Sequence, residues 1–184
     1  DRRRGRTGDG IWVHGVDPRG GTRPALDTDG CIALPNERLL ALQPSFDANV
    51  TPVLIATELS WDEPEAVAVL RIALEQAVAH WAASLEQGDM YAWLDLYDDT
   101  FEHWGMNKAE WSAFSLETVG QRPLEAVVVS DLLLLADPVE EGLYLSRFRL
   151  EISEAASRDV ISMRRIYWRR SESGALKIVA EDSG

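Results

Sequence analysis

The chain has 184 residues, of which 46% are hydrophobic and 27% are charged, and its net charge at pH 7 is −13. This composition is typical of a globular protein, and the length allows one sizeable core or two small ones. The negative charge argues against a nucleic-acid partner, because an acidic surface repels phosphate backbones. No apolar run approaches the length of a membrane span. The single cysteine excludes an internal disulfide and a multi-cysteine zinc site.

The composition changes near residue 60, which predicts two domains, 1–60 and 61–184. Up to that point the chain is rich in Gly, Pro, Thr and Asp, with β-like runs at 10–15 and 51–56. Residues 36–46 between them read as a short helix capped by Asn36. A segment of this size with so much loop would bury only a marginal core. We therefore expect a β-rich piece that is incomplete by itself.

The second part begins with helices. A long helix is predicted between Ser60 and Gly88, followed by a short one capped by Asp89. Asn107 and Glu110 form a capping-box pattern for a third helix. One face of the long helix is expected to meet a core, because apolar side chains recur along it at spacings of three and four: Val67, Leu70, Leu74, Val78, Trp81 and Leu85.

Four β segments follow, at 124–135, 143–153, 160–170 and 175–182. The residues between consecutive segments suit hairpin turns. Helices followed by an antiparallel sheet indicate an α+β fold, in which the helices cover one face of the sheet. Residues 66–182 resemble an NTF2-like domain, a cone of three helices on a strongly curved antiparallel sheet. The resemblance depends on the long first helix, on "LEQGDMYAWLDLY" and on the closing "ALKIVAED".

Cys31 and His14 are the candidate catalytic residues of the first part. A thiol attacks an acyl carbon as its thiolate, and a neighbouring imidazole can take the thiol proton as a general base. Gly30 allows a tight turn in which the Gly30 and Cys31 amides point at one oxyanion. The composition alone leaves a second interpretation open, in which Cys31 is a buried thiol near a loop histidine.

The stretch "HG…TDGCIALPNERL…TPVLI" resembles the C-terminal half of the L,D-transpeptidase (YkuD-type) catalytic domain. Two positions depart from the family pattern: Asp29 replaces a second histidine, and Ala33 replaces an Arg or Asn. The combination with an NTF2-like tail resembles a proteobacterial subgroup in which the two domains are fused. The positions that match are His14, Gly15, Thr28, Gly30, Cys31, Ile32 and the strand at 51–55.

The resemblance implies Cys31 as the nucleophile, His14 as the base, and the Gly15 carbonyl as the group that orients the imidazole. Gly30 and Cys31 would supply the oxyanion hole. Asp29 could orient a substrate amine or the imidazolium, and it could equally be an ordinary turn residue. The remaining candidate substrate contacts are Arg23, which could pair with a peptide carboxylate, and Thr28.

The resemblance also implies a function. The protein would be a peptidoglycan-modifying cysteine acyltransferase that transfers stem peptides to an amine or to water, located in the periplasm or cell envelope. No cofactor or metal is expected. The family's earlier strands would precede residue 1, which predicts a C-terminal fragment. The alternative is a catalytically degenerate scaffolding protein, whose NTF2-like domain binds a partner or ligand or forms a dimer.

Three further features complete the expectations. We expect His80 to pack or to lie at the surface of its helix. His103 and the nearby acidic residues 95–102 are interpreted as a helix end and a solvated loop. Five tryptophans suit the inside of the cone, where they could bind a ligand or simply form a core: Trp81, Trp93, Trp104, Trp111 and Trp168. An independent enzyme in the cone is the least favoured hypothesis, because the strands offer mostly apolar groups and arginines.

Overall fold

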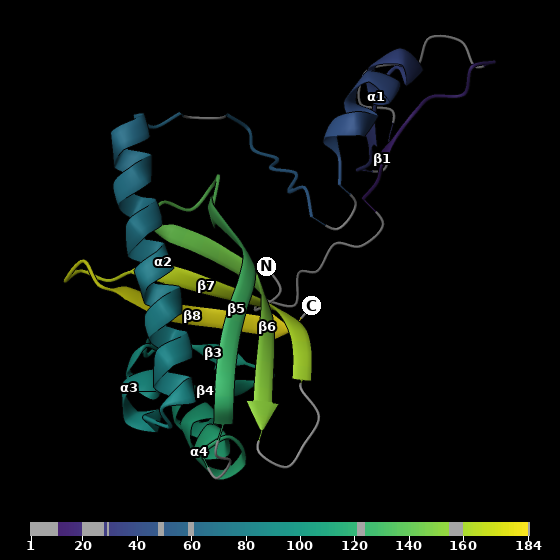
Figure 1. The fold of residues 1–184 in the computed structure, drawn as a ribbon. Helices are drawn as coiled ribbons and strands as arrows, with labels where there is room; N and C mark the ends of the chain where they lie inside the picture. The colour runs from purple at the N-terminus through teal and green to yellow at the C-terminus, as the bar shows by residue number, and fades with distance from the viewer. Residues whose placement is uncertain are drawn as a thin grey trace. The chain divides into compact units, whose positions relative to one another are not determined.

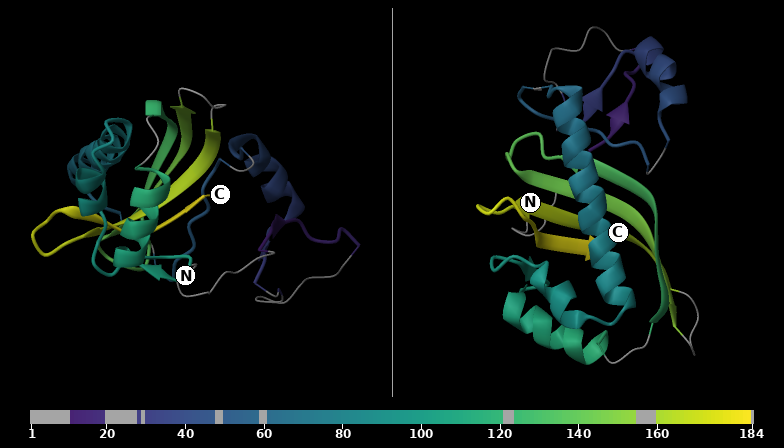
Figure 2. Two further views of the ribbon diagram at one scale, coloured as in Figure 1. Left: turned by 90° about the horizontal axis from the view of Figure 1, so that it is seen from below. Right: turned by 60° about the vertical axis from the view of Figure 1, so that its left-hand side comes forward.

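The computed structural model describes residues 11–19, 28, 30–47, 50–58, 61–120, 124–154 and 160–183. The chain divides into two compact units, Asp1–Ile55 and Ala56–Gly184. Figure 1 shows both units, and Figure 2 shows two further views.

Unit 1 is built around one short pair of strands. β1 (Val13–His14) pairs in parallel with β2 (Ile32–Ala33), and α1 (Asn36–Leu42) and the 3-10 helix η2 (Gln43–Ser45) follow. None of its described residues is buried, and several large apolar side chains are exposed. The helix predicted over 36–46 is confirmed, but its predicted cap is wrong. Pro35 is the N-cap residue, and the Asn36 side chain bonds elsewhere.

Unit 2 places helices on one face of a curved four-stranded antiparallel sheet (Figures 1 and 2). The α+β prediction for this part of the chain is confirmed. The strand order β5-β6-β7-β8 follows the chain, as hairpin turns require. The sheet consists of β5 (Leu124–Ala136), β6 (Leu143–Glu154), β7 (Val160–Arg170) and β8 (Leu176–Ser183). The helical elements are α2 (Pro64–Glu86), α3 (Met90–Asp95) and α4 (Lys108–Thr118), with a small hairpin of β3 (Glu102–His103) and β4 (Met106–Asn107).

Two predicted helix caps are confirmed. The Asp89 side chain accepts a hydrogen bond from the Ala92 amide at 3.0 Å. At α4 the capping box is complete, because the Asn107 side chain accepts from the Glu110 amide and the Glu110 carboxylate accepts from the Asn107 amide. Such caps are local in sequence, which is why they can be read from it.

The predicted apolar stripe of α2 is buried only in its second half. Leu74, Val78, Trp81 and Leu85 are buried, whereas Val67 is 48% exposed. Among the described residues, α2 is the one helix long and apolar enough to cross a membrane by length and composition, a test that core helices also pass. The buried half of α2 packs on aromatic side chains of the core. The ring centroid of Trp81 lies 5.7 Å from the ring centroid of Phe148.

Trp168 connects two central strands through a buried hydrogen bond. Its indole N–H, on β7, donates to the Ser146 hydroxyl on β6 at 2.9 Å, and both residues are 0% exposed. The Ser146 hydroxyl in turn donates to the Ile166 carbonyl at 3.4 Å. A buried polar group is tolerated when it has such a partner.

Replacing Ser146 with alanine should therefore lower the free energy of unfolding by about 1–3 kcal/mol, because the Trp168 N–H would stay buried without an acceptor. Urea denaturation followed by circular dichroism measures the change. The control is Ser173→Ala, at an exposed turn position, which should leave the unfolding midpoint unchanged. Equal effects of the two substitutions would contradict the assigned role of the Ser146 hydroxyl.

Candidate functional sites

Cys31 lies one residue before β2, at the start of the parallel pair. The Ile32 amide donates to the Trp12 carbonyl at 2.8 Å, and the Leu34 amide donates to the His14 carbonyl at 2.9 Å. The Cys31 side chain is half-buried. Gly30, just before it, has a φ of +95°, a backbone conformation that side-chain-bearing residues rarely adopt. The glycine is therefore needed for the turn that presents Cys31.

The strand register brings Cys31 and His14 to one face of the pair. Val13 is opposite Ile32 and His14 is opposite Ala33. Extending this register by one residue places Cys31 level with Trp12. Since side chains alternate along a strand, Cys31 and His14 project from the same face as diagonal neighbours. This placement is compatible with a thiol and its base, which must also come within hydrogen-bond reach of each other.

The His14 ring is held in one tautomer by the backbone carbonyl of the next residue, Gly15. Its Nδ1 lies 2.6 Å from the Gly15 carbonyl oxygen, and a carbonyl can only accept, so Nδ1 carries the proton. The other ring nitrogen, Nε2, is then an acceptor in the neutral imidazole. A general base needs this arrangement.

Gly15 has a second role, in packing against Asn36. A Cβ at this position would lie 2.2 Å from the Asn36 Oδ1, so a side chain here would displace the Asn36 amide. The Asn36 amide bonds both backbone groups of Val16, accepting from its N–H at 2.8 Å and donating to its carbonyl at 3.0 Å. Asn36 therefore fixes the segment after β1 to the start of α1, which explains why it does not cap that helix.

The three predicted substrate contacts have different outcomes. The Thr28 hydroxyl donates to the Cys31 carbonyl at 2.7 Å, so it supports the turn around the thiol. Arg23 and Asp29 lie outside the described residues. Their proposed roles remain predictions.

Unit 2 contains a buried polar cluster around Glu181, on β8. The Tyr97 hydroxyl donates to the Glu181 carboxylate at 3.0 Å, and the Trp81 indole N–H donates to the Tyr97 oxygen at 3.4 Å. His103 Nδ1 donates to the Glu181 carbonyl at 2.8 Å. The prediction that His103 lies in a solvated loop is wrong, because it is 7% exposed and stands on β3.

Burial controls the protonation of this cluster. It raises the pKa of Glu181 to about 7, although the nearby Arg164 guanidinium opposes the shift. Burial likewise raises the pKa of Tyr97, and it lowers the pKa of His103. Near neutral pH the cluster thus combines a neutral imidazole and a neutral phenol with a carboxyl group that can hold or release a proton.

The sequence interpretation missed Glu181 because of a β-bulge. On β8, Ile178 is opposite Trp168 and Ala180 is opposite Tyr167, which leaves Val179 as an extra residue. A bulge reverses the alternation of side chains beyond it. Glu181 therefore joins Ile178 on the inner face, where simple alternation would place it outside.

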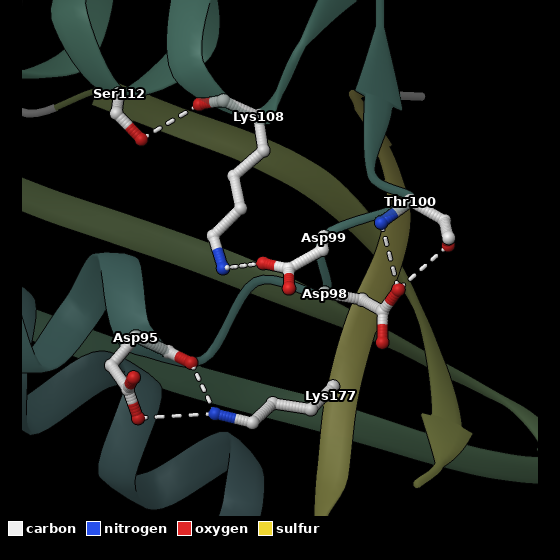
Figure 3. Close-up of polar contacts among 7 residues, drawn as sticks. All are labelled: Asp95, Asp98, Asp99, Thr100, Lys108, Ser112 and Lys177. Carbon is white, nitrogen blue, oxygen red and sulfur yellow. Dashed lines mark hydrogen bonds and ion pairs between the residues drawn. The ribbon is translucent and has the colours of Figure 1, made fainter.

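Acidic residues near the end of α3 form separate pairs at the surface (Figure 3). Lys108 Nζ lies 2.7 Å from an Asp99 carboxylate oxygen, and Lys177 Nζ lies 3.0 Å from one of Asp95. Partial burial alone would raise the pKa of Asp98, but two hydrogen bonds from Thr100 lower it. Within the described part of the chain, no three His, Cys, Asp or Glu side chains gather as a metal site would require.

Comparison with solved structures identifies the fold. An NTF2-like protein of unknown function from Pseudomonas putida matches 66% of this chain at 15% identity, with a TM-score of 0.53, over 87% of its own length. A scytalone dehydratase-like protein from Novosphingobium aromaticivorans matches over the same shares with the same TM-score, at 13% identity. The fold is NTF2-like.

Two longer structures match nearly the whole chain. Bd1075 of Bdellovibrio bacteriovorus covers 100% of it at 21% identity, with a TM-score of 0.73. Pgp2 of Campylobacter jejuni, described as a helical cell shape determining protein, covers 98% at 20% identity, with a TM-score of 0.72. The chain spans 64% and 63% of their lengths, which is less than two thirds. No protein-family model and no curated protein sequence matches.

These findings contradict the prediction that an L,D-transpeptidase-type segment is fused to the NTF2-like domain. The matches are Pgp2-like and NTF2-like structures, and the fold that they support is a single NTF2-like one. The described residues of unit 1 form only a pair of two-residue strands and short helices, without a buried core. A short motif in the right order did not establish that family. No cysteine acyltransferase activity follows from the matches.

The pKa of Glu181 leads to a testable pH dependence. Because the folded-state pKa is about 7, above the ordinary value of 4.5, the stability that protonated Glu181 contributes is complete below pH 4.5 and is lost as pH rises through 7. Glu181→Gln removes this titration. From pH 5 to pH 9 the variant should gain up to about 3 kcal/mol in unfolding free energy relative to the unmodified protein.

Thermal and urea unfolding at several pH values measures this difference. The matched control is Glu117→Gln, at an exposed position on α4, whose stability relative to the unmodified protein should stay constant with pH. A Glu181→Gln curve parallel to that of the unmodified protein would show that the buried carboxyl group does not titrate near neutrality.

Proposed function

We propose that the protein acts in shaping the bacterial cell wall, in the periplasm or cell envelope, and that Cys31 and His14 perform acyl transfer on peptidoglycan peptides. The observation that best supports this proposal is the share of the chain that each solved structure matches. Structures that match only the NTF2-like fold cover 66% of the chain, whereas Pgp2 covers 98%. The likeness to the cell-shape protein thus includes unit 1, which contains the candidate thiol.

The local geometry supports a chemical route. His14 Nε2 would take the proton of the Cys31 thiol, and the thiolate would attack the carbonyl carbon of a peptide bond. The carbonyl oxygen becomes an oxyanion, which amides at Gly30 and Cys31 could stabilise. Collapse breaks the C–N bond, and the imidazolium returns its proton to the leaving amine. Water or an amine would then release the acyl group from the sulfur.

Each element of the route corresponds to a feature of unit 1. The Gly15 carbonyl fixes the tautomer in which Nε2 can accept the proton. The positive φ of Gly30 and the Thr28 hydrogen bond define the turn that presents Cys31. Arg23 and Asp29 are proposed substrate contacts, with a peptide carboxylate and amine as their partners. The same residues serve transfer to an amine and hydrolysis.

A second candidate function is ligand binding by the NTF2-like unit, with the thiol inactive. The observation that favours it is the buried Glu181 cluster, because NTF2-like structures include a scytalone dehydratase-like protein. Among the described residues of this unit, four polar side-chain atoms are buried without a hydrogen-bond partner: Trp93 Nε1, Trp111 Nε1, Ser115 Oγ and Arg164 Nε. Such donors are commonly satisfied by water or a ligand.

Variants of the protein, produced in its natural host, distinguish the two functions. Cys31→Ser should abolish the change in muropeptide composition that the protein causes, and His14→Gln should slow product formation by about 10²–10⁴-fold. Chromatography of digested cell walls measures both. The control is Ser45→Ala, an exposed position in the same unit. Unchanged products and cell shape with Cys31→Ser would refute the acyl-transfer proposal and leave ligand binding.

A further inference from the structure

Trp12 shares one face of the parallel strand pair with Cys31 and His14. The register places Trp12 level with Cys31, and the Ile32 amide donates to the Trp12 carbonyl at 2.8 Å. Residues that are level with each other on two paired strands project from the same face. Four side chains therefore form this face: Trp12 and His14 from one strand, and Cys31 and Ala33 from the other.

These four residues occupy the corners of a small rectangle. Neighbouring strands are about 4.8 Å apart, and residues two positions apart along one strand are separated by about 6.6 Å. Trp12 is thus the nearest neighbour of Cys31 across the pair, whereas His14 lies on the diagonal. The corner opposite His14 is the lowest of the four, because the Ala33 side chain is only a methyl group.

The indole of Trp12 presents a large apolar surface beside the thiol. Trp12 is 68% exposed, whereas Cys31 and His14 are half-buried. An exposed apolar side chain is by itself ordinary at a protein surface. The position of Trp12 is what distinguishes it, because the same face carries the thiol and its candidate base. An indole is a flat and rigid apolar wall at this point.

The position of the imidazole determines on which side of the thiol each half of a substrate lies. In the proposed route His14 returns its proton to the leaving amine, so the leaving group must extend toward His14 and across Ala33. The acyl group stays on the sulfur after the C–N bond breaks. It then lies on the other side of Cys31, next to Trp12.

We propose that Trp12 determines which acyl donors the thiol accepts, by packing its indole against an aliphatic side chain of the residue that supplies the scissile carbonyl. The inference rests on the proposed acyl transfer and adds its donor specificity. Full burial of one methylene group strengthens binding about fourfold. Because the indole covers only one side of a hydrocarbon chain, we expect a four-carbon side chain to gain about tenfold over none.

Chloromethyl ketones test this specificity without requiring turnover. They carry a chloromethyl group where the leaving amine would be, and the Cys31 thiolate displaces chloride while His14 takes the thiol proton. With the purified full chain, N-acetylnorleucine chloromethyl ketone should modify Cys31 about tenfold faster than the N-acetylglycine reagent, after division by the same ratio for glutathione. Mass spectrometry measures both rates. Trp12→Ala should abolish this preference, and Trp12→Phe should retain most of it.

Ile11→Ala is the matched control, because Ile11 is 58% exposed beside Trp12 and its side chain alternates to the opposite face. It should keep the full preference. A preference that persists in Trp12→Ala, or that Ile11→Ala loses equally, would overturn the inference. So would an equal fall of both rates and of the rate with iodoacetamide in Trp12→Ala, since the tryptophan would then only support the fold around the thiol.

Iodoacetamide also separates failure of this inference from failure of the proposed function. It has no acyl side chain, so its rate with the unmodified protein reports only the activation of Cys31. A rate no higher than that of glutathione would refute the activated thiol, and with it the proposed acyl transfer. A fast reaction with iodoacetamide but equal normalised rates with the two ketones would refute the role of Trp12 alone.

Discussion

The joint between the segment after α3 and strand β8 organises unit 2. Ile178 donates its amide to the Leu96 carbonyl at 2.7 Å, and Asp98 donates its amide to the Ile178 carbonyl at 2.8 Å. The Tyr97 side chain then reaches Glu181 inside the core. Because these bonds fix the helical end of the cone to the last strand, they also position His103 and the hairpin that carries Trp104. A buried polar connection of this kind favours one arrangement over many similar apolar packings.

Local signals in the sequence predicted much of this unit, and non-local ones did not. Caps at Asp89 and Asn107 depend on neighbours a few residues away, so their chemistry is visible in the chain. Hairpin turns likewise reveal the order of the sheet. The inward position of Glu181 depends on a bulge opposite another strand, and the burial of His103 depends on a carbonyl 78 residues away. Neither can be read from periodicity.

In unit 1 the sequence predicted a local pairing of residues but did not identify the family. The order of His14, Gly30 and Cys31 predicted a thiol beside an imidazole, and the parallel register is compatible with that pairing. The same residues did not identify a family, since two strands of two residues each specify little of a fold. A chemical role can therefore be proposed for a few residues even where the sequence does not reveal the fold around them. Asn36 illustrates this point, because its side chain serves the Val16 backbone and not the helix that it begins.

The contact between Gly15 and Asn36 has a consequence for how this segment can evolve. The missing Cβ at position 15 is the space that the Asn36 amide occupies. A larger residue at 15 would displace that amide and leave the Val16 backbone without its two hydrogen bonds. In homologous sequences, positions 15 and 36 should therefore change together. They should covary although the hydrogen-bonded residues Val16 and Asn36 are 20 positions apart in the chain.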